Sequence, residues 1–255
     1  MPCPRVCATT CPMHSLIIHM SASTARRPNA EALLHALPDA RLVEAVDGRD
    51  PAQVTGVTIR PGDAHAPAYP FPLSPGEIGC FLSHRRCWKR ILDEGWDHAL
   101  IVEDDLAIDP ARLRAALALI RAHATPDSYI RLPVKPREKP ARVLGESDGL
   151  ALILPRVIGL QTVAQVVGRG AAERLLAATA TIDRPVDTLL QMHWVTGQPV
   201  HSLLGSGAQE LTADLGGSTI QKKTRAGSKL AREFKRAAYR AQVALRPQRP
   251  VRPGS

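Results

Sequence analysis

The stretch Ser74–Asp105, SPGEIGCFLSHRRCWKRILDEGWDHALIVEDD, decides the fold. It opens with an N-cap serine, a proline in the first turn and a glutamate placed to complete a capping box, all within Ser74–Glu77. Apolar residues then recur at helical spacing until Gly95, a typical helix stop. An apolar run over 98–102 follows and ends in three acids, Glu103, Asp104 and Asp105. The stretch therefore predicts a long helix and, after it, a buried strand that ends in carboxylates.

Strand and helix patterns alternate on both sides of this stretch. Residues 15–20 and 41–46 are predicted strands, with a helical stretch through 30–37 between them. On the C-terminal side the predicted elements are a helix opening at Asp109-Pro110, strands at 129–134, 150–154 and 162–167, and short helices at 170–178 and 185–194. Residues 135–149 are predicted to form a polar, basic loop. The alternation predicts an α/β fold around a central, mostly parallel sheet.

The composition is that of a soluble globular protein. Of the 255 residues, 44% are hydrophobic and 22% charged, and no apolar run approaches the roughly 18 residues needed to span a membrane. This excludes a transmembrane protein. No basic segment followed by an apolar core opens the sequence, so the expected compartment is the cytoplasm. Two of the five cysteines, Cys80 and Cys87, lie inside a helical pattern, and the set is expected to be reduced.

Positive charge is concentrated in one segment. Residues 221–255 contain eleven lysines and arginines against one acid, whereas the other 220 residues contain 22 basic and 23 acidic residues. A nearly neutral domain over 13–220 is therefore expected to carry a basic tail over 221–255. Residues 1–12 hold Cys3, Cys7 and Cys11 among prolines in a pattern that completes no zinc site, and are expected to be a non-native or disordered extension.

The basic tail has the pattern of an amphipathic helix. Its apolar positions fall on one stripe, with Arg232, Lys235, Arg236 and Arg240 away from it. The stripe consists of Leu230, Phe234, Ala237, Ala238, Ala241, Ala244 and Leu245. Two interpretations remain open. In the first, the helix attaches the protein to the anionic inner face of a membrane. In the second, the helix packs on the domain and its charged side chains face water.

The three acids after the apolar run are the first candidates for chemistry. Carboxylates so close together repel one another unless a cation compensates them, and carboxylate oxygens suit Mg²⁺ or Mn²⁺. Ligands of open α/β sheets bind beyond the carboxyl ends of the strands, where this triplet is expected to lie. The alternative is a solvated strand end whose acids cap the following turn.

Four segments, in this order, resemble glycosyltransferase family 25: Ala45–Gly48, Leu73–Cys80 continuing into Leu82–His84 and Trp88, Ala99–Asp105, and Pro185–Asp187. This is the family of bacterial lipooligosaccharide galactosyltransferases, to which the collagen galactosyltransferases are related. The resemblance covers residues 15 to about 220. It implies a GT-A-like nucleotide-sugar-binding fold. It also implies inverting transfer of a hexose, typically galactose from UDP-galactose, to a glycan or lipid-linked saccharide acceptor in lipopolysaccharide or lipooligosaccharide synthesis.

The resemblance also implies roles for individual residues. Glu103, Asp104 and Asp105 take the place of the acidic motif that binds a divalent cation, Mn²⁺ rather than Mg²⁺, and that cation holds the donor diphosphate. A metal neutralises the charge that develops on the leaving group. Asp187 matches the Pro-x-Asp element and is the candidate general base or acceptor-orienting residue. Its alternative role is structural, because aspartate near a helix start is favourable without any function.

Further candidates surround these carboxylates. Arg26 and Arg27 follow the first strand where the family carries an arginine, and guanidinium pairing suits a diphosphate, although either residue alternatively is a surface charge. Ser83 and His84 match a Ser-His pair and imply donor contact or orientation of the acidic motif. Glu77 has a structural explanation as a capping-box residue.

Two departures from the family pattern put base or sugar stacking in doubt. His19-Met20 stands where Asn-Leu is common, and Gln165 stands where an aromatic residue is expected.

The rival function is that of a non-enzymatic basic protein that binds membranes or nucleic acid through the basic tail. A nucleic-acid binder usually spreads its basic residues over a folded face with aromatics, and the sequence has only three Trp, three Tyr and three Phe. A third reading is a pseudo-enzyme on the same fold, against which the intact acidic triplet argues. The sequence therefore favours a metal-dependent hexosyltransferase whose partners are a nucleotide-sugar donor, a glycan acceptor and an anionic membrane, without nucleic acid.

Overall fold

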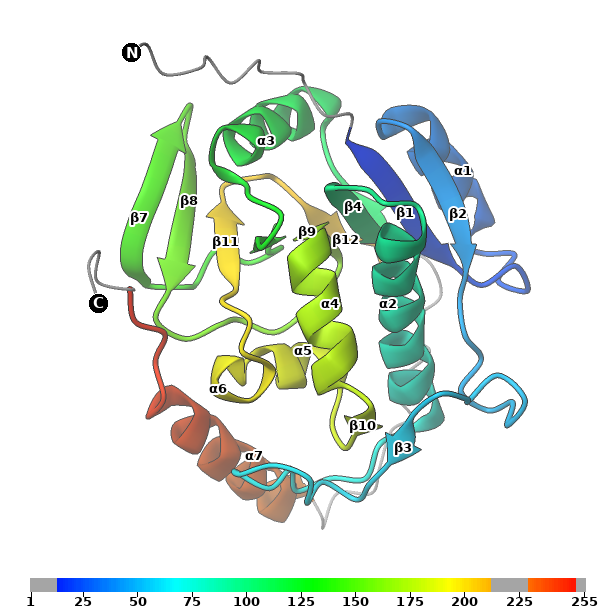
Figure 1. The fold of residues 1–255 in the computed structure, drawn as a ribbon, viewed down its shortest axis with the longest axis vertical. Helices are drawn as coiled ribbons and strands as arrows, with labels where there is room; N and C mark the ends of the chain where they lie inside the picture. The colour runs from blue at the N-terminus through cyan, green and yellow to red at the C-terminus, as the bar shows by residue number, and fades with distance from the viewer. Residues whose placement is uncertain (1–12, 212–228, 251–255) are drawn as a thin grey trace, which may run out of the picture.

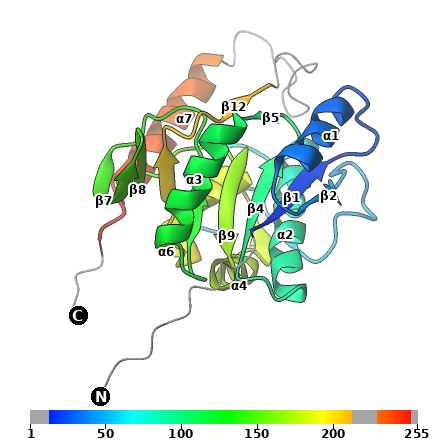
Figure 2. The ribbon, with the colours of Figure 1, turned by 90° about the horizontal axis from the view of Figure 1, so that it is seen from above.

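The computed structural model describes residues 13–211 and 229–250, and its centre is an eight-stranded sheet of order β2-β1-β4-β9-β6-β11-β8-β7 (Figure 1). Six strands run in the same direction, whereas β8 and β9 run against them. Both views place β1 and β2 towards one edge and β7 and β8 at the other (Figures 1 and 2). The predicted α/β fold with a mostly parallel sheet is confirmed. The strands are β1 (His14–His19), β2 (Ala40–Glu44), β4 (His98–Glu103), β6 (Tyr129–Arg131), β7 (Pro140–Ser147), β8 (Leu150–Pro155), β9 (Ala164–Gly168) and β11 (His201–Leu204).

Two short pairs of strands lie outside the main sheet. They join β3 (Thr58–Ile59) to β10 (Thr181–Ile182), and β5 (Leu106–Ala107) to β12 (Gln209–Glu210). The second pair follows directly on the end of β4 and therefore fixes the chain just beyond the acidic triplet.

Helices cover both faces of the sheet, and the alternation of side chains along β1 assigns each face its helices. Leu16 and Ile18 pack with Trp88 of α2 and with α4 and α5, whereas Ile17 packs with Leu33 of α1 and with α3. The helices are α1 (Arg27–Ala36), α2 (Pro75–Asp93), α3 (Pro110–His123), α4 (Arg169–Ala178), α5 (Val186–Leu190), α6 (His193–Thr196) and α7 (Lys229–Ala244). Among the helices of the described residues, none is both long and apolar enough to cross a bilayer.

The start of α2 is built as the sequence indicates. Ser74 Oγ accepts a hydrogen bond from the Glu77 backbone N–H, and Ser74 N–H donates to Glu77 Oε2 at 2.7 Å. This capping box gives Glu77 the structural role expected of it. A Cβ on Gly79 would overlap the carbonyl oxygen of Val46, and one on Gly48 would overlap that of Pro75. Two of the segments that carry the family resemblance therefore pack backbone against backbone, which only glycine permits here.

The prediction of a loop over 135–149 was wrong, because most of this segment forms β7. Asp148 and Gly149 have positive φ angles of 49° and 73° and make the tight turn that pairs β7 with β8. The β7 strand lies at the sheet edge, is mostly exposed and has an irregular register, so it lacks the alternating apolar pattern that marks a strand in the sequence. The single helix predicted over 185–194 divides into α5 and α6.

The C-terminal helix α7 packs on the domain, but by a face other than the predicted apolar stripe. Tyr239 and Val243 are buried, at 6% and 4% exposure, whereas Phe234 and Leu245 are 77% and 80% exposed. Beyond the helix, Gln248 is buried and its side chain bonds to backbone groups of Val200 and Pro155. The described side chains of the stripe, Phe234, Ala237, Ala238, Ala241, Ala244 and Leu245, are therefore exposed to solvent.

Candidate active site

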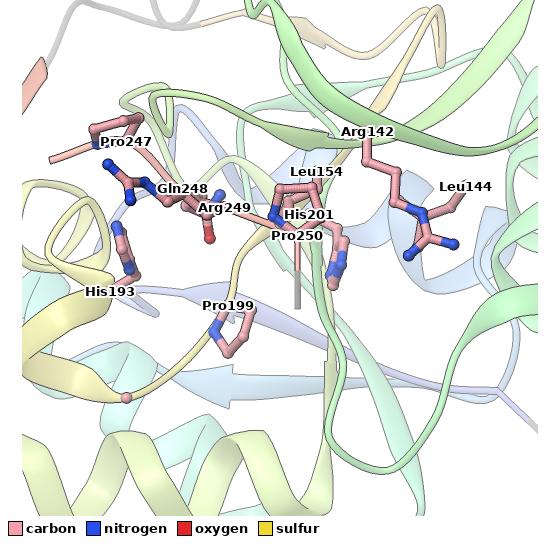
Figure 3. A pocket seen from close by; sticks show the side chains of 11 residues that line it. Arg142, Leu144, Leu154, His193, Pro199, His201, Pro247, Gln248, Arg249 and Pro250 are labelled. Carbon is pink, nitrogen blue, oxygen red and sulfur yellow. The ribbon is translucent and has the colours of Figure 1, made fainter. Parts of the chain in front are cut away.

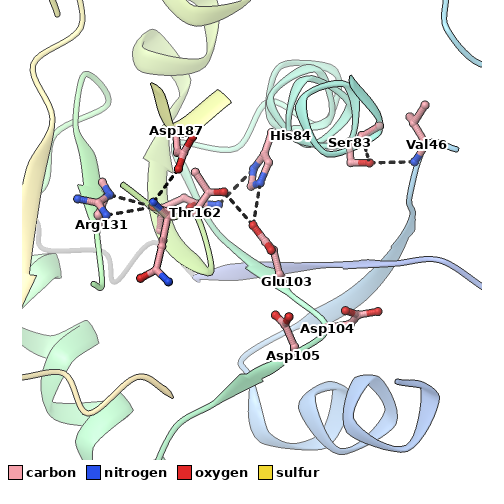
Figure 4. A network of polar contacts seen from close by, with 12 residues as sticks. Val46, Ser83, His84, Glu103, Asp104, Asp105, Arg131, Thr162 and Asp187 are labelled. Atoms are coloured by element: carbon pink, nitrogen blue, oxygen red, sulfur yellow. Dashed lines mark hydrogen bonds and ion pairs between the residues drawn. The ribbon is translucent and has the colours of Figure 1, made fainter. Parts of the chain in front are cut away.

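Glu103, at the end of β4, faces α2 across the sheet surface (Figure 4). Its Oε1 accepts a hydrogen bond from Thr162 Oγ1 at 2.8 Å and lies 3.4 Å from His84 Nε2. Burial alone would raise the pKa of the Glu103 carboxyl, but the contacts with His84 and Thr162 and the charge of Arg26 outweigh it and hold that pKa below its usual value. Glu103 is therefore kept ionised and oriented.

Asp104 and Asp105 lie on the other side of β4, near the start of α1 (Figure 4). Asp104 Oδ2 is 2.8 Å from His19 Nδ1, and Asp104 Oδ1 is 2.8 Å from Arg26 Nη1. The same Arg26 nitrogen lies 3.2 Å from Asp105 Oδ2. Burial alone would lower the pKa of Arg26, but these two carboxylates outweigh it and raise that pKa. Two carboxylates therefore share one guanidinium.

These placements test whether the triplet fits one divalent cation. Glu103 points towards α2, whereas Asp104 has both carboxylate oxygens engaged by Arg26 and His19. Glu103 therefore points away from Asp104 and Asp105, and as placed the three carboxylates do not form one three-carboxylate site. Glu103 is the last residue of β4, whereas the two aspartates lie in the turn that follows and both contact Arg26.

Gln161 and Thr162, neighbours in the chain, connect Asp187 with Glu103. The Gln161 N–H donates to Asp187 Oδ2 at 3.0 Å, while the Thr162 hydroxyl donates to Glu103. Gln161 has φ of 78°, a left-handed conformation that is strained for a residue with a long side chain. Asp187 and Glu103, predicted separately, are therefore placed in one hydrogen-bonded group with a strained backbone between them.

A buried arginine supports this strained segment from β6. Arg131 donates to the carbonyl oxygen of Gln161 at 3.1 Å, and also to that of Leu160. It forms an ion pair of 2.7 Å with Glu138, and both side chains are at most 6% exposed. Neither Gln161 nor Arg131 was among the predicted site residues. No sequence signal marks them, because their importance arises from contacts between segments far apart in the chain.

The remaining predicted site residues differ in where they lie. His84 and Arg26 contact the acidic triplet as described. Ser83 instead accepts from Val46 N–H at 2.8 Å and donates to Gly79, so it ties α2 to the end of β2 (Figure 4). Arg27 pairs with Glu31 on the exposed side of α1.

Gln165, at the position where an aromatic residue was expected, is fully buried beside His84. Its Nε2 lies 3.3 Å from His84 Nδ1, and its Oε1 has no hydrogen-bond partner among the described residues. A polar partner for the histidine that contacts Glu103 therefore stands where the sequence comparison led us to expect an aromatic residue.

A buried ion pair lies directly before Asp187. Arg184 and Asp183, 0% and 1% exposed, pair through two bonds of 2.7 and 2.8 Å. Burial alone would raise the pKa of Asp183, but Arg184 outweighs it and holds that pKa below its usual value. Arg184 also donates to the carbonyl oxygens of His65 and Pro67 and to Tyr239 Oη of α7. The position of Asp187 is therefore tied to the loop before α2 and to α7.

A cavity of about 520 Å³ lies elsewhere, between β7, α6 and residues 247–250 (Figure 3). Arg142, His193, His201 and Arg249 contribute to its wall, together with leucine and proline side chains. None of the predicted site residues lines it.

Comparison with known proteins agrees with the resemblance in the sequence. The profile of Glycosyltransferase family 25 (LPS biosynthesis protein) matches residues 13–144. Procollagen galactosyltransferase 1 of Danio rerio is 37% identical over 73 residues, 27% of this chain and 12% of that protein. The protein of Bos taurus named "Probable inactive glycosyltransferase 25 family member 3" is 30% identical over 171 residues, 61% of this chain and 28% of that protein.

The matched part of these relatives is thus at most 28% of their length. A solved structure, the mannose-1-phosphate geranyltransferase from Thermus thermophilus, aligns over 78% of this chain and 76% of its own, with a TM-score of 0.39 and 14% identity, a similarity too distant to bear on function. The family profile covers more than half of the sequence, including α2 and the acidic triplet, and the α/β fold is the class that the family implies. The chain belongs to glycosyltransferase family 25.

Proposed function

We propose that this protein is an inverting hexosyltransferase that moves galactose from UDP-galactose to a glycan acceptor in lipopolysaccharide or lipooligosaccharide synthesis. The family profile carries lipopolysaccharide biosynthesis in its description, and several relatives are named galactosyltransferases. The observation that carries the proposal is the group formed by Asp187, Gln161, Thr162 and Glu103 at the carboxyl end of β4, beside the Arg26 carboxylate pair. Ligands bind at this end of the strands in α/β sheets.

The chemistry assigned to this group is a single displacement at the anomeric carbon. Asp187 accepts the proton of an acceptor hydroxyl, whose oxygen forms the new bond to the sugar on the face opposite to the diphosphate. The bond from the anomeric carbon to the phosphate oxygen breaks, and its electron pair leaves with UDP. We assign Arg26 to the diphosphate: it contacts Asp104 and Asp105 through Nη1, and a guanidinium carries further N–H donors that suit phosphate oxygens. Glu103 stays ionised in this scheme and orients a hydroxyl group of the donor sugar.

Metal dependence stays a prediction. Mn²⁺ was expected at Glu103, Asp104 and Asp105, and the divergence of these side chains argues against one ion bound by all three. A metal at the donor diphosphate would stabilise the leaving group. Transfer that is unchanged by chelator, and by Asp105→Asn at saturating donor, would remove the metal from the proposal.

The decisive experiment incubates the full chain with a panel of UDP-sugars and measures UDP release with and without acceptor, Mn²⁺ and chelator. UDP-galactose is expected to give the fastest release, and Asp187→Asn to abolish most of it. The control is Asp63→Asn, which removes a carboxylate from an exposed pair with Arg60. Because one relative carries the word inactive in its name, absence of turnover with every donor and acceptor is a defined result, and it would favour a binding protein on the same fold.

We also propose that α7 attaches the protein to the inner, anionic face of a membrane. The supporting observation is that its buried face is Tyr239 and Val243, so that Phe234 and Leu245 are left in water on the opposite side. Lys235 lies on the exposed part of the same helix. An outward apolar stripe with basic neighbours is typical of an interfacial helix.

The attachment is tested by substitution, because removing α7 would also remove Tyr239 from Arg184. Phe234→Ser with Leu245→Ser is expected to reduce sedimentation with anionic vesicles, and Val143→Ser, at another exposed apolar residue, is the control. High salt should weaken the binding. Equal sedimentation of all three proteins would refute the membrane role. Binding of the unsubstituted chain to DNA but not to vesicles would favour the rival function of a nucleic-acid binder.

A further inference from the structure

We propose that Cys80, His84 and Glu103 form a binding site for a zinc-class divalent cation, distinct from the three-carboxylate site expected of the acidic triplet. One ligand atom of each residue lies within 4.8 Å of the other two. Cys80 and His84 are four residues apart in α2 and therefore lie on one face of the helix, opposite Glu103 of β4. The site needs no substrate and does not rest on the proposed transfer reaction.

The donor set selects the metal. A thiolate, an imidazole and one carboxylate are the ligands of Zn²⁺ and similar ions, whereas Mn²⁺ and Mg²⁺ prefer oxygen ligands alone. Three protein ligands also leave a fourth position of a tetrahedral ion for water or another oxygen. Thr162, whose hydroxyl reaches both Glu103 and the Cys80 thiol, is the neighbouring oxygen.

The distance between His84 and Glu103 supports coordination. Their Nε2 and Oε1 atoms are 3.4 Å apart, beyond the usual range of a hydrogen bond. Adjacent ligand atoms of a tetrahedral ion with bonds of about 2.0 Å lie about 3.3 Å apart. The pair is therefore already spaced as two ligands of one ion, and the Cys80 sulfur lies within 4.8 Å of both atoms.

Gln165 provides the outer partner that a ligating histidine needs. A histidine that binds metal through Nε2 carries its proton on Nδ1 and donates it to an acceptor. Gln165 lies 3.3 Å from His84 Nδ1, is 0% exposed, and its Oε1 is a buried oxygen without a hydrogen-bond partner among the described residues. Rotation of this amide by 180° exchanges its two polar atoms and brings Oε1 to Nδ1–H. In the metal-bound form the Gln165 oxygen would therefore accept the Nδ1 proton of His84.

Binding of the ion is expected to release one proton from the protein. The Cys80 thiol releases its proton to the solvent and binds as thiolate, His84 binds as neutral imidazole, and Glu103 is already ionised. One proton released per ion is therefore an expected readout.

The test uses the full chain with Cys3, Cys7 and Cys11 replaced by serine, so that those thiols do not contribute. After chelator treatment and its removal, Co²⁺ is titrated as a spectroscopic substitute and Zn²⁺ is counted by elemental analysis. One ion per chain and a thiolate-to-cobalt charge-transfer band are expected. Cys80→Ser and His84→Gln should both remove the band, whereas Cys87→Ala, which removes a buried thiol of the same helix that faces the core, should retain it.

Two measurements keep the proposal falsifiable if a variant fails to fold. Gln165→Leu should weaken Zn²⁺ binding by about 10- to 100-fold, while Gln165→Glu, which keeps an acceptor, should restore it. In the protein with Cys80 and His84 intact, Zn²⁺ should protect Cys80 from alkylation and leave the alkylation of Cys87 unchanged. Mass spectrometry measures the modification of each cysteine. Absence of the cobalt band and of protection, or a band that persists in Cys80→Ser, would overturn the proposal. Because no donor or acceptor is present, this outcome is independent of whether the protein transfers sugar.

Discussion

Replacing Arg184 by methionine should cost the fold about 3 to 5 kcal/mol, because it leaves the Asp183 carboxylate buried without a partner. Both side chains are at most 1% exposed, and the two bonds between them are 2.7 and 2.8 Å long. The carbonyl oxygen of Pro67 and Tyr239 Oη, each 3.0 Å from the guanidinium, lose a donor as well. For a chain of this size, 1 kcal/mol corresponds to about 2 to 4 °C in Tm, so a fall of about 6 to 20 °C is expected.

A matched control separates burial from charge pairing. Arg60 forms the same two-bond pair with Asp63, at 2.9 and 2.8 Å, but both side chains are about half exposed. Arg60→Met should therefore cost at most about 1 kcal/mol. Unfolding in urea, with slope and midpoint compared across variants, measures both effects. Asp183→Asn added to Arg184→Met should recover much of the loss, because no unpaired charge remains. Equal small losses for Arg184→Met and Arg60→Met would refute the reasoning.

Three further outcomes are expected. Gly79→Ala should destabilise the protein by about 1 to 3 kcal/mol in urea unfolding, because the new methyl group meets the carbonyl oxygen of Val46, and an unchanged midpoint would contradict the close approach. The ion pair of Asp183 stabilises the fold fully above the unfolded pKa of about 3.9, and this stability is lost as the pH falls through the lower pKa that Asp183 has in the folded state. Below about pH 4, Tm should therefore drop more steeply in the unsubstituted protein than in the variant with Asp183→Asn and Arg184→Met. Parallel curves of Tm against pH would exclude the effect. Asp187→Asn should lower kcat about 10²- to 10⁴-fold with donor Kd unchanged, and lost donor binding with normal single-turnover chemistry would assign Asp187 to binding.

The parts of the fold that the sequence predicts correctly are those encoded within one segment. The capping box at Ser74 and Glu77, and the apolar run of β4, each depend on residues adjacent in the chain, so their patterns survive into the structure. The edge strand β7 shows why other parts escape. Its apolar alternation is absent because one edge and much of its surface meet water, and only the Asp148-Gly149 turn, a recognised hairpin signal, marked it.

The candidate site shows the same division. Glu103, Asp104, Asp105 and Asp187 carry motif signals, whereas the bridge between Glu103 and Asp187 is made by Gln161 and Thr162, which carry none. The direction in which each acid points was not predictable either, because it depends on which helix supplies a partner. A sequence motif therefore identifies the charges of the site, but long-range packing decides how they are grouped.

The contacts of Arg184 also constrain the order in which this protein assembles during synthesis. Its partners are His65, Pro67, Asp183 and Tyr239, and the ribosome makes Tyr239 after all of the others. Domains generally fold as units, so α7 can enclose the arginine only after the chain has been made as far as Tyr239. The buried cluster around Arg184 is therefore completed only when the loop before α2, the segment before α5 and α7 have come together.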